Sequence, residues 1–374
     1  MSGVPRPNAI ATLLLTEDFI AGAQTLLYSL HVNLPSSPCA PDYYPPEVIV
    51  LVTPNISQES RSTLSLLCTR VIEVDPIPIP IINDNNHSHQ SQWTECGYTK
   101  LNIFRQSVYH KILYLDCDCL VQMDVSSLLK LEHQMSRGLI AAAPDIFPPD
   151  KFNAGVMLIT PSTILFEELM RKAKSTISYD GGDTGFLNAV FDDWYCYPKE
   201  GRLSFKYNAQ RFMYLCTYDK QPKYWNIGVG DVAIIHYSSS PKPWQDTISA
   251  KIGDASAFLT KDDSVRVHKA KNISQLDTTW KKYYKRSLTF LEDCRETQKL
   301  KLEQKARRIA KLPRSSVSKS SSEHRKVSLK YKELRRQGLD TKDAMNQARK
   351  IYGLDGTDSK SAGKQVAALF GMPL

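Results

Sequence analysis

The stretch Ile112-Leu113-Tyr114-Leu115-Asp116-Cys117-Asp118-Cys119 decides the fold class of this chain of 374 residues. Its four leading apolar residues predict a buried strand, and two carboxylates separated by one residue follow that strand directly. In open α/β sheets, ligands bind beyond the carboxyl ends of strands, so we expect Asp116 and Asp118 at a binding edge. Their oxygens suit a hard cation such as Mg²⁺ or Mn²⁺. The alternative is a surface pair that caps a turn.

Strands and helices alternate on both sides of this stretch. Apolar runs predict strands at 10–16, 47–54, 70–74, 155–159 and 232–236. Helical periodicity predicts helices at 19–30, 57–67, 99–109, 125–131 and 162–175. The alternation predicts an α/β domain with a largely parallel sheet, and the polar segment 83–93 has the composition of a loop.

Charge divides the chain into an acidic body and a basic C-terminal part. Residues 265–374 hold 27 Lys and Arg against 11 Asp and Glu, whereas the rest holds 21 against 28. We expect a main domain over 1–260, a helix or helices partly docked on it over 261–312, and a basic, flexible tail over 313–374. The tail is either a solvated extension or a segment that contacts polyanions.

Neither end of the chain carries a pattern for export or membrane insertion. The N-terminus has no apolar core of a signal peptide, and no run approaches the roughly 18 apolar residues of a membrane span. The eight cysteines show no Cys-x-x-Cys spacing and are expected to be reduced thiols. The sequence therefore predicts a cytoplasmic protein without a transmembrane segment.

A second group of candidate ligands follows the strand predicted at 232–236. His236 ends that strand and opens a loop of small residues that includes Ser239 and Lys242. Backbone N–H groups of such a loop, together with the lysine, suit phosphate oxygens. An imidazole as third ligand favours Mn²⁺ over Mg²⁺. The alternative is a structural histidine at a strand end.

Residues 10–246 resemble the glycogenin-like glycosyltransferases of family 8, the broad family that includes galactinol synthase. Short segments match in order and spacing, namely 12–23, 50–54, 99–101, 116–118, 142–156, 181–188, 207–208 and 236–242. The resemblance implies a GT-A-type, Rossmann-like mixed sheet flanked by helices. It also implies a metal held by Asp116, Asp118 and His236.

The resemblance further implies a site for a UDP-sugar. The residues expected to line it are Leu13, Leu14, Phe19, Lys100, Cys117, Asn153, Ala154, Asp180, Thr184, Asn208 and Ser239. Asp183 and Asp145 are expected to act on the sugar, and Lys242 to stabilise the departing diphosphate. Structural alternatives are a core role for Phe19, a helix cap for Asp183 and a glycine-dependent turn at 153–155.

The implied reaction is a retaining transfer of glucose or galactose from UDP-glucose or UDP-galactose to a hydroxyl acceptor, with Mn²⁺ or Mg²⁺. Thr184 replaces the family's usual Gln, and Leu14-Leu15 replaces a Thr pair, so donor contacts are expected to differ. Tyr214 and Tyr218 are out of register with the self-glucosylated Tyr. We therefore expect a separate acceptor: a glycan, a protein-linked sugar or a polyol. The alternatives are a self-glucosylating primer and a polyanion-binding protein, and a homodimer is left open.

Overall fold

The structure is a computed structural model. It describes residues 6–35, 44–80, 95–131, 140–145, 150–196, 201–211, 213, 232–238, 240–245, 263–310 and 330. By its internal contacts the chain divides into two compact units, residues 1–294 and 295–374. The loop predicted at 83–93 and the tail predicted at 313–374, apart from Lys330, lie outside the described residues.

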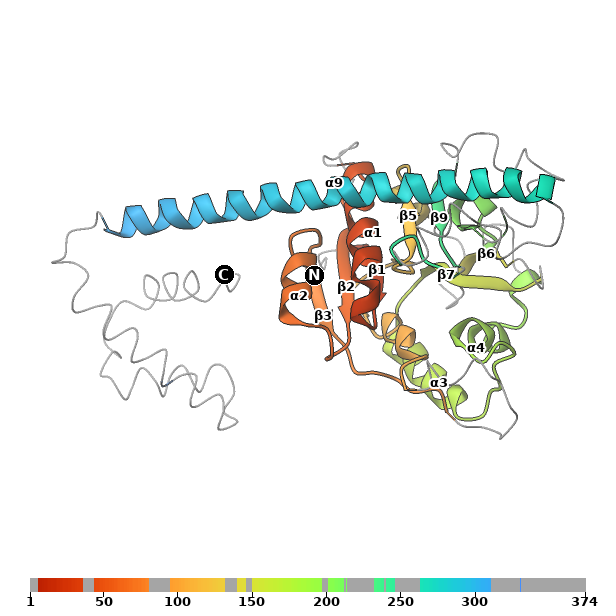
Figure 1. Cartoon of the computed structure of the whole chain (residues 1–374). Coiled ribbons are helices and arrows are strands. Elements are labelled where there is room, and N and C mark those ends of the chain that lie inside the picture. The colour runs from red at the N-terminus through yellow and green to blue at the C-terminus, as the bar shows by residue number, and fades with distance from the viewer. Residues whose placement is uncertain are drawn as a thin grey trace. The chain divides into compact units, whose positions relative to one another are not determined.

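A mixed six-stranded sheet with the order β3-β2-β1-β4-β7-β6 forms the centre of the first unit (Figure 1). Four neighbouring strands are parallel: β1 (Ala9–Leu14), β2 (Glu47–Val52), β3 (Arg70–Glu73) and β4 (Ile112–Leu115). Beyond β4, β7 (Phe152–Ile159) runs antiparallel to β4, and β6 (Ala141–Pro144) runs antiparallel to β7. The strand predicted at 232–236 is β9 (Ile234–His236), which begins two residues later than predicted.

A second, three-stranded sheet lies directly after the two aspartates. Its order is β5-β9-β8, with β5 (Cys119–Val121), β9 (Ile234–His236) and β8 (Ala209–Gln210). β5 runs antiparallel to β9, and Cys119 is the register partner of His236. The chain therefore passes from one sheet to the other at residues 116–118, and β9 brings His236 to the same point.

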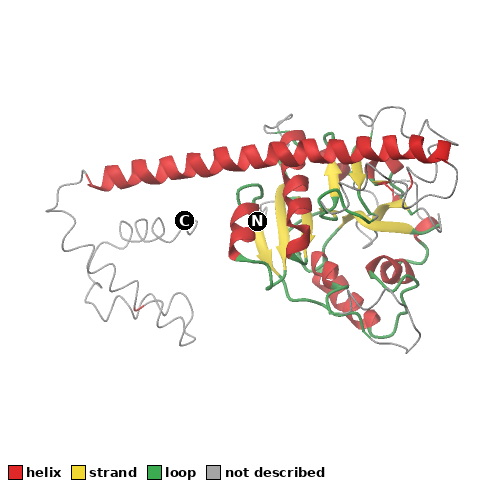
Figure 2. Ribbon diagram, viewed as in Figure 1, coloured by secondary structure: helices red, strands yellow, loops and turns green. Residues whose placement is uncertain are grey.

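Helices flank these sheets (Figure 2). The α-helices are α1 (Ile20–Asn33), α2 (Gln58–Leu64), α3 (Thr163–Ala173), α4 (Asp183–Val190) and α9 (Asp263–Ala310). Short 3₁₀ helices are η1 (Glu17–Phe19), η3 (Thr99–Ile103), η4 (Ser126–Lys130), η6 (Trp194–Cys196) and η8 (Phe205–Tyr207). Ser57 and Ser162 cap α2 and α3 by accepting hydrogen bonds from backbone N–H groups three residues on.

The helix predicted over 99–109 is wrong beyond its first turn, since only η3 forms there. The side-chain amide of Asn102 donates to the carbonyl oxygens of Asp75 and Thr99, and the Thr99 hydroxyl accepts from the N–H of Ile77. Such side-chain bonds to backbone compete with the helical pattern and favour a tight turn.

The helical residues after 276 belong to one continuous helix, α9. Within the first unit its buried side chains include Leu276, Trp280, Ser287 and Leu291. Residues 295–304, in the second unit, have exposed side chains. Among the described residues, no helix has the length and apolarity needed to cross a membrane.

Candidate active site at the junction of the two sheets

The three predicted metal ligands meet where β4 passes into β5. The N–H of Asp116 donates to the Gly155 carbonyl at 2.8 Å, which ties the turn to β7. Nε2 of His236 lies 3.2 Å from Oδ1 of Asp118 and 3.8 Å from Oδ2 of Asp116. The strand pairing of β5 with β9 produces this approach, because Asp118 immediately precedes β5 and His236 ends β9 opposite Cys119.

Each carboxylate has one oxygen that is held by other side chains. Oδ1 of Asp116 accepts a hydrogen bond from the Tyr114 hydroxyl at 2.8 Å and lies 3.0 Å from Nζ of Lys100. Oδ2 of Asp118 lies 2.6 Å from Nζ of Lys242. The second oxygen of each carboxylate therefore faces His236. Two carboxylate oxygens and one imidazole nitrogen would, if they bound one ion, form a donor set that suits Mn²⁺ or a similar cation.

A chain of hydrogen bonds sets the tautomer of the buried His236. Oδ1 of Asn153 accepts from the Gly155 N–H and from the amide nitrogen of Asn208, each at 2.9 Å. The amide oxygen of Asn208 is thereby directed at Nδ1 of His236, 2.9 Å away. A carbonyl-type oxygen accepts only, so Nδ1 carries a proton, and Nε2 is the ring nitrogen that faces the two aspartates and can bind a cation.

Gly155 is required for this arrangement. A Cβ at position 155 would lie 2.2 Å from Cε1 of His236 and 2.9 Å from Oδ1 of Asn153. The alternative that 153–155 is a glycine-dependent turn is therefore correct in part: the glycine lies in β7 and permits the close approach of the imidazole.

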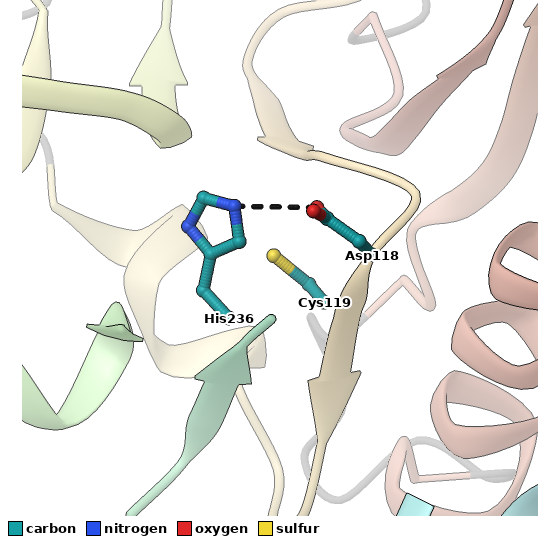
Figure 3. A group of neighbouring side chains, drawn as sticks. All are labelled: Asp118, Cys119 and His236. Atoms are coloured by element: carbon teal, nitrogen blue, oxygen red, sulfur yellow. Dashed lines mark ion pairs between the residues drawn. The ribbon is translucent and has the colours of Figure 1, made fainter. Parts of the chain in front are cut away.

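Cys119 lies beside the ligands, as Figure 3 shows together with Asp118 and His236. One ligand-type atom of each of these residues lies within 4.8 Å of the others. The Cys119 Sγ contacts the Gly155 carbonyl at 3.9 Å, and burial raises the pKa of the thiol well above its ordinary value. The carboxylate oxygens suit a hard cation better than this sulfur does, and Cys119 packs in a hydrophobic cluster of the core.

Lys100 connects the metal ligands to Asp183. Its Nζ lies 2.5 Å from Oδ2 of Asp183, 3.0 Å from Oδ1 of Asp116 and 3.3 Å from the Ala154 carbonyl. An ammonium group has three hydrogens, so these partners use all of them. Lys100 was expected to contact the UDP-sugar. To do so, it would have to give up one of these three hydrogen-bond partners.

The charges around Lys100 control its protonation and that of Asp183. Burial alone would lower the pKa of Lys100, but Asp116 and Asp183 outweigh it and raise that pKa. Burial raises the pKa of Asp183, an effect that Lys100 opposes and that the negative charge of Asp116 reinforces. The ammonium group of the buried Lys100 thus pairs with two partly buried carboxylates.

The helix cap expected of Asp183 is correct only in part: Asp183 is not the N-cap residue of α4, but its Oδ1 accepts a 2.9 Å hydrogen bond from the backbone N–H of Thr184 in the first turn. The helix begins at Asp183 itself, and its N-cap residue is Gly182. Asp180 takes the capping role instead, because its Oδ1 accepts from the N–H groups of Gly182 at 2.8 Å and Gly185 at 2.9 Å. Asp183 keeps Oδ2 for Lys100, and Thr184 lies half-buried in the first turn of the helix.

Asp145 is attached to the second sheet. Its Oδ1 accepts a 3.0 Å hydrogen bond from the side-chain amide of Gln210, whose register partner across β8 and β9 is His236. Asp145 is therefore anchored one strand away from the imidazole. Sequence reasoning missed Gln210, which no motif marked. It also missed Tyr114, although a residue two before Asp116 on a strand shares its face.

The loop after β9 holds Lys242 against Asp118 and the Phe19 ring. Nζ of Lys242 donates to the Tyr237 carbonyl at 2.7 Å and lies 5.8 Å from the centroid of Phe19. Phe19 meets Trp244 edge to face, with ring centroids 5.5 Å apart. Burial would raise the pKa of Asp118, but His236 and Lys242 outweigh it and hold that pKa below the ordinary range.

The other residues expected to line the UDP-sugar site lie in different surroundings. The side chains of Leu13 and Leu14 are buried in hydrophobic clusters of the core. Cys117 is half-buried in the turn between the aspartates, and burial raises its pKa. Ser239 lies outside the described residues. The structure thus gathers Lys100, Asp116, Asp118, Asn153, Ala154, Asp183, Asn208, His236 and Lys242 in one connected group.

Curated proteins with similar sequences include glycogenins and a glucuronosyltransferase. Rabbit (Oryctolagus cuniculus) glycogenin-1 is 30% identical over 246 residues, 65% of this chain and 67% of that protein. Neurospora crassa glycogenin is 31% identical, with 63% of this chain matched to 31% of that protein. The match therefore covers from about a third to about two thirds of the length of these relatives. Inositol phosphorylceramide glucuronosyltransferase 1 of Arabidopsis thaliana is 28% identical over 63% of this chain and 42% of that protein.

Among solved structures, the glycosyltransferase GlyE of Streptococcus pneumoniae TIGR4 matches 74% of this chain and 60% of its own, with 21% identity and a TM-score of 0.48. The mixed sheet with flanking helices has the GT-A-type, Rossmann-like architecture that the sequence predicts. Residues 10–248 match the model of glycosyl transferase family 8, and the chain belongs to that family.

Proposed function

We propose that this chain is a Mn²⁺-dependent, retaining hexosyltransferase that moves glucose or galactose from a UDP-sugar to a hydroxyl group of a separate acceptor. The observation that carries the proposal is the convergence of Asp116 Oδ2, Asp118 Oδ1 and His236 Nε2, with Lys242 beside them. Family membership supports the donor class.

The donor set fits a divalent cation with mixed oxygen and nitrogen preference. Asp116 and Asp118 supply oxygens, and His236 supplies a lone pair that the hydrogen bond from Nδ1 to Asn208 leaves available. Mg²⁺ seldom accepts nitrogen, so Mn²⁺ is the better match. When bound, the cation neutralises charge that develops on the departing diphosphate.

The protein's own groups perform three tasks in this proposal. Lys242 supplies a positive charge for the diphosphate, in the place where it now pairs with Asp118. Lys100 links the carboxylate of Asp183 to that of Asp116. In one route Asp183 attacks the anomeric carbon as the bond to UDP breaks, and the acceptor hydroxyl then displaces Asp183 from the sugar. In the other route Asp183 and Asp145 stabilise positive charge on the sugar while UDP departs and the acceptor enters from the same side. Both routes retain configuration.

The proposed acceptor is a glycan, a protein-linked sugar or a polyol, and the proposed location is the cytoplasm. The lack of a tyrosine in register with the self-glucosylation site supports a separate acceptor, although Tyr214 and Tyr218 lie outside the described residues. The Arabidopsis relative is named for glucuronosyl transfer, so UDP-glucuronic acid belongs among the donors to be tested.

A donor screen tests the proposal directly. The purified chain is incubated with UDP-glucose, UDP-galactose or UDP-glucuronic acid, with Mn²⁺, with Mg²⁺ or with EDTA, and released UDP is measured. We expect metal-dependent release with UDP-glucose or UDP-galactose and loss of release in Asp118→Ala, whose circular dichroism stays that of the wild type. Equal UDP release with and without metal, or no release with any donor, would refute the proposal.

The self-glucosylating primer is the second candidate, and the glycogenin relatives favour it. Intact mass before and after incubation with UDP-glucose and Mn²⁺ separates the two. An unchanged mass supports a separate acceptor, whereas additions of one hexose at a time would establish the primer.

A further inference from the structure

Helix α9 contacts both ends of the loop that carries Lys242. Before the lysine, the Tyr237 hydroxyl donates a 2.7 Å hydrogen bond to the backbone carbonyl of Leu276. After it, Trp244 packs against Trp280 with ring centroids 5.3 Å apart. Leu276 and Trp280 lie one turn apart on α9, so one face of the helix covers the loop on both sides of Lys242.

A buried ion pair joins the same face of α9 to the middle of the loop. Nη1 of Arg211 lies 3.1 Å from Oδ1 of Asp277, and the two side chains are only 4% and 8% exposed. Nη2 of the same guanidinium donates to the Pro241 carbonyl at 2.5 Å. Arg211 also lies over the Tyr237 ring, 5.6 Å from its centroid. The residue that Arg211 holds through its carbonyl is the immediate neighbour of Lys242.

The geometry of the Arg211–Asp277 pair is better suited to fixing the position of the loop than to stabilising the fold. Removing two charges from water costs several kcal/mol per ion, and well-packed apolar residues of the same volume often stabilise a fold equally well. A planar guanidinium fixes two partners at a set angle, which apolar packing does not do. Among the partners of Arg211 are Asp277 on the helix and Pro241 in the loop.

We propose that Arg211 and Asp277 are positioning residues that hold Lys242 where it meets the diphosphate of the UDP-sugar, so that α9 is part of the donor site's support. The proposal rests on the proposed function, since it takes a diphosphate as the ligand of Lys242. Asp277 fixes the guanidinium to the helix, and the guanidinium fixes the backbone beside Lys242. Removing the charge of Asp277 therefore loosens the loop without touching the metal ligands.

The test compares Asp277→Asn with Ser287→Ala. Ser287 is also a buried polar residue of α9, and its hydroxyl accepts from Gln24 on the neighbouring α1 at 2.8 Å. It is therefore a matched control for a weakened helix contact. Binding of UDP in the presence of Mn²⁺ is measured by calorimetry, and KM and kcat with the active UDP-sugar by UDP release.

We expect Asp277→Asn to raise the Kd for UDP and the KM for the UDP-sugar about tenfold, less than the roughly hundredfold that a 1 Å displacement of a reacting group can cost. Ser287→Ala keeps both values within about twofold, even where the two variants lose the same amount of Tm. Arg211→Lys, which has one nitrogen for two partners, is expected to fall between wild type and Asp277→Asn. Equal UDP binding by Asp277→Asn and wild type would overturn the inference.

A double-mutant cycle separates positioning from general damage. If Asp277 acts through Lys242, adding Asp277→Asn to Lys242→Met weakens UDP binding little further, whereas independent effects multiply. Multiplying effects would refute the coupling. A wild-type chain that binds no UDP would instead refute the proposed function, so the two failures are distinguishable.

Discussion

The hydroxyl of Tyr114 donates a 2.8 Å hydrogen bond to Oδ1 of Asp116, and it does so from a fully buried position two residues earlier on β4. This bond, together with Lys100, occupies one oxygen of the carboxylate. The other oxygen is left directed at His236. Tyr114 therefore orients a proposed metal ligand without contacting the metal.

The first prediction follows from that bond. Tyr114→Phe removes the hydroxyl and allows the Asp116 carboxylate to rotate, so the Kd for Mn²⁺ is expected to rise about tenfold to hundredfold, as is usual when the partner of a metal ligand is lost. Mn²⁺ binding is followed by electron paramagnetic resonance. Tyr109→Phe is the matched control, because the Tyr109 hydroxyl donates to Glu47 at 2.8 Å, at the start of β2. Equal Mn²⁺ affinities in the two variants would contradict the orienting role.

The second prediction concerns Gly155. A Cβ there overlaps the His236 ring, so Gly155→Ala is expected to displace the imidazole and reduce turnover about hundredfold. Gly182→Ala is the control, since its Cβ would meet nothing closer than 3.6 Å. UDP release by both variants is compared at saturating Mn²⁺. Wild-type turnover in Gly155→Ala would mean that His236 does not need its present position.

The sequence predicts most of the sheet, because continuous apolar runs mark buried strands well. The run 112–115 predicts β4 to the residue. The helix predicted over 99–109 is too long. The side-chain amide of Asn102 donates to the carbonyl of Asp75, and this bond depends on the position of the segment that follows β3. Periodicity in a single sequence does not contain that information.

The candidate site was predictable where its residues lie at strand ends or match family motifs, as do Asp116, Asp118 and His236. Contacts between distant segments were not predictable. Arg211 and Asp277 are 66 residues apart, and neither lies in a motif. Lys100 was expected to contact the donor, but its pairing with Asp183 joins η3 to α4 and becomes visible only when both pack against β4 and β7.

The third prediction concerns acid stability. The pKa of Asp118 lies below its ordinary value of 3.8, because His236 and Lys242 outweigh the effect of burial. A lowered folded-state pKa means that ionised Asp118 adds stability above that value, and that the contribution is lost as the pH falls through the folded-state pKa. Asp118→Asn is therefore expected to be less stable than wild type at about pH 5, with the difference narrowing towards about pH 2.

Urea unfolding in EDTA at several pH values measures this difference. Because only the wild type can lose the charge at position 118, the two unfolding free energies should converge at low pH. A gap that is constant with pH would show that Asp118 contributes through shape and hydrogen bonding alone.

The last prediction concerns Lys100, whose ammonium group pairs with both Asp116 and Asp183. Lys100 is 9% exposed and separates the carboxylates of Asp116 and Asp183, so Lys100→Met leaves two negative charges facing each other across an apolar side chain. We expect a loss of about 3 kcal/mol in the free energy of unfolding, the lower end for a broken buried pair, since the aspartates are 26% and 22% exposed. Adding Asp183→Asn removes one of the charges and should restore about 1 kcal/mol.

The exposed pair of Lys172 and Glu168 is the control, and Lys172→Met should cost less than about 0.5 kcal/mol. A double variant that is less stable than Lys100→Met would show that Asp183 is held by contacts other than the charge of Lys100.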